Sequence, residues 1–359
     1  MRKGSVLLAA AIGPVTIGLF ATAAVADAPR IADPLVAPFF APNQGDTRAL
    51  LILNDGRVAA KAYAPGYGDA NRFISWSMNK TVTAMLVGAL VADGRLALDA
   101  PAPVAEWRAP GDPRGRITLR HLLTMSSGLS HTEVGQPIER SDTNQVLFVG
   151  GTADMAARAI AQPLEARPGE KFEYSSLTSI ILSEIVTRAL TGSRDPRVRA
   201  ETYRRFASER LFAPAGIRSA FLEFDGAGTQ VGGSLLHMTL SDWGRFGMVL
   251  LDGRSLDGRA VVAPDWLAFM KTPAATSPGY GGQTWLNHAR PGKRPMFPGA
   301  PASVASAEGH LGQHVTVSPD SGSGRGVVIV RLGNAPDTPV RPDTLLIART
   351  LARHFPRAR

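Results

Sequence analysis

One helical segment constrains the fold of this chain more than any other feature. Residues 77–93 read Ser-Met-Asn-Lys-Thr-Val-Thr-Ala-Met-Leu-Val-Gly-Ala-Leu-Val-Ala-Asp, and beyond Lys80 they are apolar on nearly every side. A helix that is apolar all round is buried inside a folded protein. The segment therefore predicts a central helix that the rest of the chain surrounds, with Gly94 as its stop.

The sequence predicts strands near both ends of the chain. Residues 49–64 indicate a hairpin, because apolar stretches flank the turn sequence Asn-Asp-Gly at 54–56. Near the other end, 313–318 alternates apolar and polar residues, 327–332 is a strongly apolar strand, and 342–354 has the period of an amphipathic helix. We expect the two hairpins to share one antiparallel sheet, flanked by helices, in a fold of the α/β (α+β) class.

The middle of the chain, residues 96–271, is expected to be a mostly helical insertion between two sheet-forming parts, 27–95 and 272–359. Its apolar residues recur with a helical period in several segments, and loops rich in glycine and proline separate these segments. Helices are expected at 117–125, 152–162, 176–190, 199–212, 241–252 and 264–271, with Ser241 as the N-cap of the 241–252 helix.

The first 26 residues resemble a signal peptide rather than part of a domain. Arg2 and Lys3 give a short positive region, residues 5–26 carry no charge, and Ala-Val-Ala at 24–26 is a suitable cleavage site. An uncleaved membrane anchor is the rival interpretation, because the apolar run is close to the ~20 residues that a bilayer needs. Either way the sequence predicts an exported protein, periplasmic or secreted, with the membrane as a partner only through such an anchor.

Composition limits the other partners and cofactors. The chain has no cysteine, which excludes disulfides and thiolate metal sites, and its net charge is +9. The basic residues are scattered without a stripe or interleaved aromatics, so nucleic acid is not an expected partner. His310 and His314 would lie too far apart on a strand to share a zinc ion. We therefore expect no metal and no cofactor.

The start of the central helix carries a candidate nucleophile. Ser77 and Lys80 share one helix face, because side chains three residues apart are neighbours. A serine hydroxyl needs a base to remove its proton. Burial and the positive helix N-terminus both lower the pKa of a lysine, which would make Lys80 that base. The N-terminal position also leaves the Ser77 N–H free to bind an oxyanion. The alternative is a capping serine beside a surface lysine.

The surroundings of this pair resemble the class C β-lactamase-like serine hydrolases over roughly residues 45–335. The superfamily includes D,D-carboxypeptidases, esterases and 6-aminohexanoate-dimer hydrolases, and the last branch is the most similar. The resemblance implies a β-lactamase/penicillin-binding-protein-like fold in which all parts form one catalytic domain. The segments that carry it are 75–84, 93–96, 117–129, 168–176, 241–247 and 309–313.

This resemblance implies roles for further residues. Tyr174 matches the Tyr-x-Asn motif and would relay a proton to the leaving group, whereas Ser176 replaces the asparagine that contacts the substrate. His310-Leu311-Gly312 matches Lys-Thr-Gly, and it would lie on an edge strand beside the cleft. His310 and Gly312 would then contact the substrate, and the N–H of Gln313 would complete the oxyanion hole with that of Ser77.

The sequence therefore predicts an exported enzyme that cleaves a small ester or amide through an acyl-enzyme on Ser77. The replacements Ser176 and His310 weaken one alternative, a β-lactamase or D,D-carboxypeptidase of the penicillin-binding type. A second alternative is a non-catalytic binding protein on the same fold. The absence of a Gly-x-Ser-x-Gly sequence argues against an α/β-hydrolase.

Overall fold

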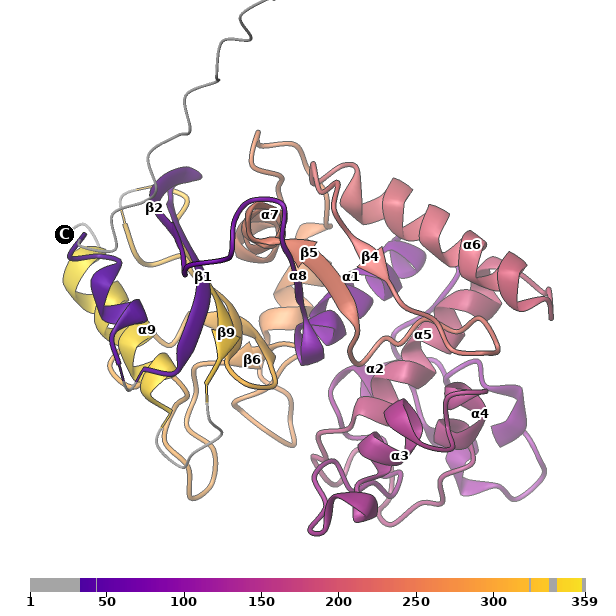
Figure 1. Cartoon of the computed structure of the whole chain (residues 1–359). Coiled ribbons are helices and arrows are strands. Elements are labelled where there is room, and N and C mark those ends of the chain that lie inside the picture. The colour runs from indigo at the N-terminus through magenta and orange to yellow at the C-terminus, as the bar shows by residue number, and fades with distance from the viewer. Residues whose placement is uncertain (1–32, 43, 323, 336–340, 357–359) are drawn as a thin grey trace, which may run out of the picture.

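The main sheet takes its strands from both ends of the chain. The computed structural model describes residues 33–42, 44–322, 324–335 and 341–356. The sheet is antiparallel throughout (Figure 1), as the sequence predicted, and the α/β class is confirmed. In spatial order its strands are β2 (Arg57–Tyr63), β1 (Asp46–Asn54), β9 (Val327–Asn334), β8 (Gln313–Ser318), β7 (Ala305–Gly309) and β6 (Trp285–Leu286).

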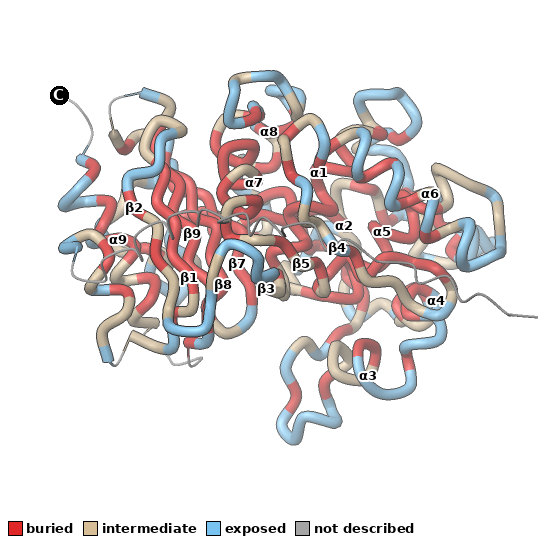
Figure 2. The backbone as a smooth tube through the Cα atoms, turned by 45° about the horizontal axis from the view of Figure 1, so that its top comes forward, coloured by how far each residue is buried: buried red, intermediate tan, exposed pale blue. Residues whose placement is uncertain are grey.

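Both faces of this sheet are covered, which explains its continuous apolar strands. Successive side chains of a strand point to opposite faces, so Leu51 and Leu53 of β1 join one core while Leu50 and Ile52 join another. Helix α9 (Pro342–His354) packs on the second face, and α7 (Leu240–Asp252) packs on the first. Figure 2 shows the strands between them as buried.

Two glycines let α7 approach the sheet closely. A Cβ at Gly244 would lie 2.4 Å from the Cδ2 of Leu51, and one at Gly247 would lie 2.3 Å from the Cγ1 of Val328. No other residue type leaves that space empty. Helix α7 was expected to be part of the helical insertion, residues 96–271. In the structure it packs against the main sheet and so lies with the sheet part.

The predicted central helix is present and buried. It is α1 (Asn79–Ala92), with Gly94 in a left-handed conformation just beyond its end. Its neighbours include α5 and α8. The indole of Trp266 fits against Gly88, where a Cβ would lie 2.2 Å from the indole nitrogen. The other helices of this region are α2 (Leu119–Leu123), α3 (Asp142–Phe148), α4 (Met155–Ile160), α5 (Ser176–Leu190), α6 (Pro196–Ala207) and α8 (Pro264–Lys271).

Capping explains where expected helix starts were misplaced. Helix α7 begins one residue before the expected start, and its N-cap is Thr239, which accepts a hydrogen bond from the N–H of Asp242; Ser241 is inside the helix. Helix α6 begins at Pro196 because Asp195 caps it, and a π-helical turn, Ser208–Phe212, follows. Helix α3 had not been expected, because polar residues dominate its first turn.

A small second sheet sets the position of Ser77. It consists of β3 (Arg72–Ile74), β5 (Leu236–Thr239) and β4 (Phe221–Leu222), with β5 in the centre. Ser75 continues the pairing, since its N–H donates to Leu236 O at 2.7 Å and its hydroxyl accepts from Leu236 N at 3.1 Å. The chain leaves this anchored residue and enters the turn that carries Ser77.

The predicted signal peptide, residues 1–26, lies outside the described residues. Among the residues that the structure describes, no helix combines the length and the apolar character needed to cross a membrane.

Candidate active site

Ser77 and Lys80 lie in hydrogen-bond contact, as the sequence predicted. Ser77 occupies a short 3-10 turn, Trp76–Met78, which runs directly into α1. The Nζ atom of Lys80 donates to the Oγ atom of Ser77 at 2.9 Å. Trp76, immediately before Ser77, has a φ of 44°, a strained conformation of the kind found at functional sites.

Lys80 is buried, and the protein satisfies its amine. Only 1 % of the residue is exposed. Besides Ser77, its Nζ atom donates to Ser176 Oγ and to Gly233 O, each at 2.9 Å. Burial lowers the pKa of Lys80 to about 8, and the negative charge of Glu133 opposes that decrease. A substantial fraction of this lysine is therefore neutral in mildly alkaline solution.

Glu133 belongs to this network, and sequence reasoning missed it. Its carboxylate accepts from Ser176 N at 2.8 Å, Ser176 Oγ at 2.6 Å and Thr143 Oγ1 at 2.8 Å, and it lies 2.6 Å from His131 Nε2. Burial alone would raise the pKa of Glu133, but the bond with His131 and the charge of Lys80 lower it to about 2. The sequence signal was slight: a carboxylate two residues after a histidine, in a segment where no helix or strand was expected.

Ser176 lies behind Lys80 rather than on the cleft wall. It is the first residue of α5 and is 3 % exposed, and its hydroxyl accepts from Lys80 and donates to Glu133. The residue expected to contact a substrate is thus the link between the lysine and its counter-charge.

Tyr174 stands beside Ser77 in an aromatic box. Its ring stacks on Trp285 with centroids 5.2 Å apart and meets Tyr280 edge-on at 5.9 Å, and Lys80 Nζ lies 4.8 Å from its centroid. Burial and the charge of Glu133 raise the pKa of Tyr174 well above its usual value, although a hydrogen bond with Ser77 opposes this. The side chain is therefore a neutral phenol.

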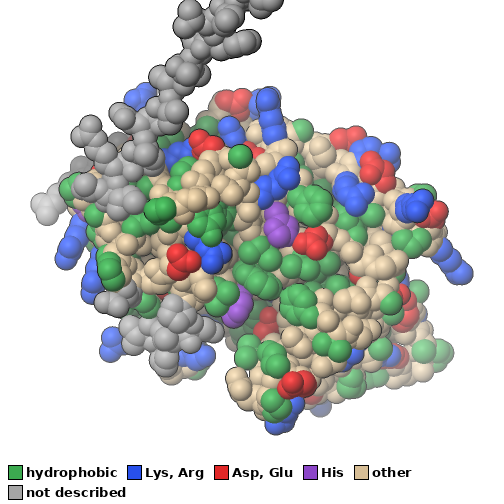
Figure 3. Space-filling view, in the orientation of Figure 1, with side chains coloured by type: hydrophobic (Ala, Val, Ile, Leu, Met, Phe, Trp, Pro, Cys, Tyr) green, Lys and Arg blue, Asp and Glu red, His purple; other side chains and the backbone are tan. Residues whose placement is uncertain are grey.

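A cleft of about 260 Å³ opens at Ser77. One wall comes from the helical part and carries Glu133, Val134 and Tyr174. The other wall belongs to the sheet part. Its residues are Trp285, Met296, Glu308, Gly309, His310, Leu311, Gly312, Ala335 and Arg341. In the space-filling view, hydrophobic side chains gather around the hollow between the two parts (Figure 3).

The motif at residues 310–312 forms a hairpin turn, not the expected edge strand. His310-Leu311-Gly312 connects β7 to β8, with φ of 60° at Leu311 and 77° at Gly312. His310 and Gly312 line the cleft, as expected, and His310 is exposed. Gly309 comes so close to the turn before Ser77 that a Cβ there would lie 2.3 Å from Ser75 O.

Gln313 holds this hairpin and is not among the residues that line the cleft. It is the first residue of β8 and is 3 % exposed. Its amide donates to His310 O and Leu311 O, both at 3.2 Å, and to Gly333 O at 2.6 Å, and it accepts from Gly333 N at 3.0 Å. The side chain thus ties the turn to the end of β9.

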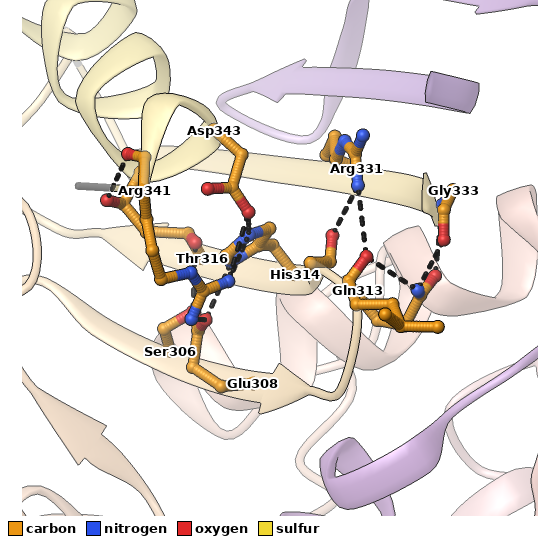
Figure 4. Close-up of polar contacts among 12 residues, drawn as sticks. Ser306, Glu308, Gln313, His314, Thr316, Arg331, Gly333, Arg341 and Asp343 are labelled. Carbon is orange, nitrogen blue, oxygen red and sulfur yellow. Dashed lines mark hydrogen bonds and ion pairs between the residues drawn. The ribbon is translucent and has the colours of Figure 1, made fainter. Parts of the chain in front are cut away.

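A buried charge cluster forms part of the same wall (Figure 4). The imidazole of His314 in β8 lies between two carboxylates, with Nδ1 2.7 Å from Glu308 and Nε2 2.5 Å from Asp343. Arg341 lies 3.0 Å from Asp343. Burial opposes the charged imidazole, but Glu308 and Asp343 outweigh it and raise the pKa of His314. This cluster connects β7, β8 and the start of α9.

The described residues contain no group of three or more His, Cys, Asp or Glu side chains arranged to hold a metal ion. At Ser77 the site brings together a hydroxyl, the Lys80 amine of lowered pKa and the Tyr174 phenol.

Known proteins resemble this chain in sequence. A family model described as Beta-lactamase matches residues 36–352. The 6-aminohexanoate-dimer hydrolase of Paenarthrobacter ureafaciens is 27% identical over 321 residues, which cover 83% of this chain and 74% of that protein. Esterase EstB of Burkholderia gladioli is 34% identical over 124 residues, which cover 32% of this chain and 31% of EstB.

Solved structures agree on the fold. A family VIII carboxylesterase superposes with a TM-score of 0.64 at 15% identity, covering 88% of this chain and 95% of that one. The octameric penicillin-binding protein homologue from Pyrococcus abyssi superposes with a TM-score of 0.61 at 17% identity, covering 86% of this chain and 73% of that one. The match of the family model over most of the sequence shows that this chain belongs to the Beta-lactamase family.

Proposed function

We propose that this chain is a serine hydrolase that cleaves small esters or amides through a covalent acyl-enzyme on Ser77. The observation that carries the proposal is the 2.9 Å contact between the buried amine of Lys80 and the Ser77 hydroxyl, together with the lowered pKa of that amine. The names of two relatives, one an amide hydrolase and one an esterase, support both substrate classes.

The proposed reaction moves one proton at a time. Neutral Lys80 takes the proton of Ser77 as the Oγ atom attacks the substrate carbonyl. The Tyr174 phenol donates its proton to the leaving alcohol or amine, and Lys80 returns a proton to Tyr174. Lys80 then removes a proton from a water molecule, which attacks the acyl ester. This step releases the carboxylic acid and regenerates Ser77.

The oxyanion of the tetrahedral intermediate needs two N–H donors. One donor is the backbone N–H of Ser77. For the second, we propose the N–H of His310 in place of Gln313. His310 lines the cleft and packs against Trp76, directly before Ser77, whereas Gln313 is not among the residues that line the cleft.

Two features favour small esters and amides over β-lactams. His310 stands where the resemblance expects a lysine for a β-lactam carboxylate, and Ser176 is occupied by Lys80 and Glu133. A β-lactamase or D,D-carboxypeptidase remains the second candidate function, because the family and fold include it. We also propose that the protein is exported, which N-terminal sequencing of the mature protein would test.

The test is hydrolysis of p-nitrophenyl acetate, a linear ω-amino-acid dimer and a chromogenic cephalosporin by the purified protein. Ser77→Ala should abolish turnover of every substrate while the thermal unfolding midpoint stays near that of the wild type. The ester or the dimer should be preferred over the cephalosporin. A Ser77→Ala protein that keeps most of its activity, or a wild type that binds substrates without turnover, would contradict the proposal.

A further inference from the structure

Exposed apolar side chains are concentrated in residues 134–149, the segment that begins at the cleft wall with Val134 and includes α3. Four of them lie within residues 134–149: Val134, Ile138, Phe148 and Val149 are 72%, 53%, 54% and 57% exposed. Single exposed hydrophobic residues are ordinary on a protein surface, but a contiguous group beside a cleft marks a binding surface.

Two members of this group, Val134 and Phe148, lie with Trp76 and His310 beside the active site, and we name these four residues the acyl lip. The Trp76 ring meets Phe148 edge-on with centroids 6.5 Å apart and meets His310 edge-on at 5.5 Å. Val134 and His310 line the same cleft as Ser77. The lip therefore extends from α3 of the helical part to the β7–β8 hairpin, next to the nucleophile.

The chemistry decides which arm of a substrate would reach this lip. Tyr174 protonates the leaving group, so the leaving group must lie on the Tyr174 side of Ser77. The ring neighbours of Tyr174 are Tyr280 and Trp285, and neither belongs to the lip. The arm on the Trp76 side of the nucleophile is then the acyl arm.

We propose that the acyl lip binds an apolar acyl chain, which makes esters and amides of medium-chain or aryl carboxylic acids the preferred substrates. This inference rests on the proposed hydrolase function. The side chains of Trp76, Val134 and Phe148 carry no charge, so burial of methylene groups supplies the binding free energy. A charged acyl arm gains nothing from these contacts.

The test compares p-nitrophenyl acetate with p-nitrophenyl hexanoate, which share a leaving group. Phe148→Ala should lower kcat/KM for the hexanoate by about fivefold to tenfold, the scale of one or two methylene groups leaving water. The hexanoate-to-acetate ratio of kcat/KM should fall by a similar factor, and Phe148→Leu should restore most of that ratio. Phe221 is the matched control, because it is also 54% exposed but lies in β4.

Each outcome is decisive. The lip is supported if only Phe148→Ala lowers the hexanoate-to-acetate ratio. It is overturned if both esters lose equally, if neither changes, or if Phe221→Ala has the same effect. Sedimentation that shows Phe148→Ala separating a dimer, with the ester ratio unchanged, assigns the surface to a second copy of this chain. Ser77-dependent turnover without a preference for the hexanoate overturns the lip alone, whereas no Ser77-dependent turnover of any ester overturns the hydrolase as well.

Discussion

Two opposing effects act on the amine of Lys80, and Glu133 supplies one of them. Removal of water favours the neutral amine, and the carboxylate, joined to it through Ser176, favours the ammonium ion. The resulting pKa of about 8 leaves most of the lysine charged at neutral pH. Acylation of Ser77 should therefore accelerate as the pH rises towards about 8.

Glu133→Gln should move this pH dependence to lower pH. The amide keeps an acceptor for Ser176 but loses the negative charge that raises the pKa of Lys80. The measurement is the rate of Ser77 acylation by an activated ester between about pH 6 and 10. Glu165→Gln is the control, because Glu165 pairs with exposed Lys171 instead. A Glu133→Gln profile that shifts to higher pH, or does not move, would show that Glu133 does not charge this lysine.

At the scale of single residues, the sequence predicts what is local. Ser77 and Lys80 are three positions apart, in a 3-10 turn and the first turn of α1 that continues it, so their contact follows from local helical geometry. Glu133 reaches the same amine through a loop whose path no periodic pattern predicts. The edge strand expected at residues 310–312 is a turn instead, because Leu311 and Gly312 adopt left-handed conformations that no periodic pattern predicts.

Among the elements, the β7–β8 hairpin depends on a close approach to the turn that carries Ser77. Gly309→Ala would place a Cβ 2.3 Å from Ser75 O, so one of the two backbones must move. A shift of this kind should lower the acylation rate by about 10²-fold, because reacting groups lose their alignment. Gly68→Ala is the matched control, since a Cβ there has no neighbour within 4 Å. Acylation of Gly309→Ala at the wild-type rate would show that the hairpin position does not matter.

The elements themselves were largely predictable, because their periods and turn residues agree. The hairpin of β1 and β2, strands β8 and β9, and helices α5, α8 and α9 lie close to their expected bounds. The short strands β3, β4 and β5 were not predictable, because each is stabilised by pairing with distant segments rather than by its own pattern. They matter most here, since they anchor Ser75 and hence Ser77.

For the molecule as a whole, the buried charge cluster joins the sheet to α9. His314→Ala would leave Glu308 and Asp343 buried without the imidazole between them. Removal of one partner from a buried ionic network costs about 3–5 kcal/mol of unfolding free energy. The free energy of unfolding by urea measures this loss. His354→Ala, at an exposed position of α9, should cost almost nothing.

The same cluster predicts a pH dependence of stability. Because the folded-state pKa of His314 is raised, its contribution is complete below the unfolded value of about 6.5 and is lost as the pH rises through the folded value. The stability difference between wild type and His314→Ala should therefore shrink in alkaline solution. A difference that grows with pH would contradict a charged imidazole at this position.

The most direct test of the account is the pre-steady-state rate at which an activated ester acylates Ser77 in the wild type, Lys80→Arg and Lys271→Arg. Arginine keeps the charge but cannot accept the proton. Lys271 is the matched control, because burial lowers its pKa to about 8 as well, yet its amine donates to Leu251 O. We predict that Lys80→Arg slows acylation by about 10²-fold or more, while Lys271→Arg stays near the wild-type rate. Equal rates in Lys80→Arg and the wild type would contradict the role of Lys80 as the base.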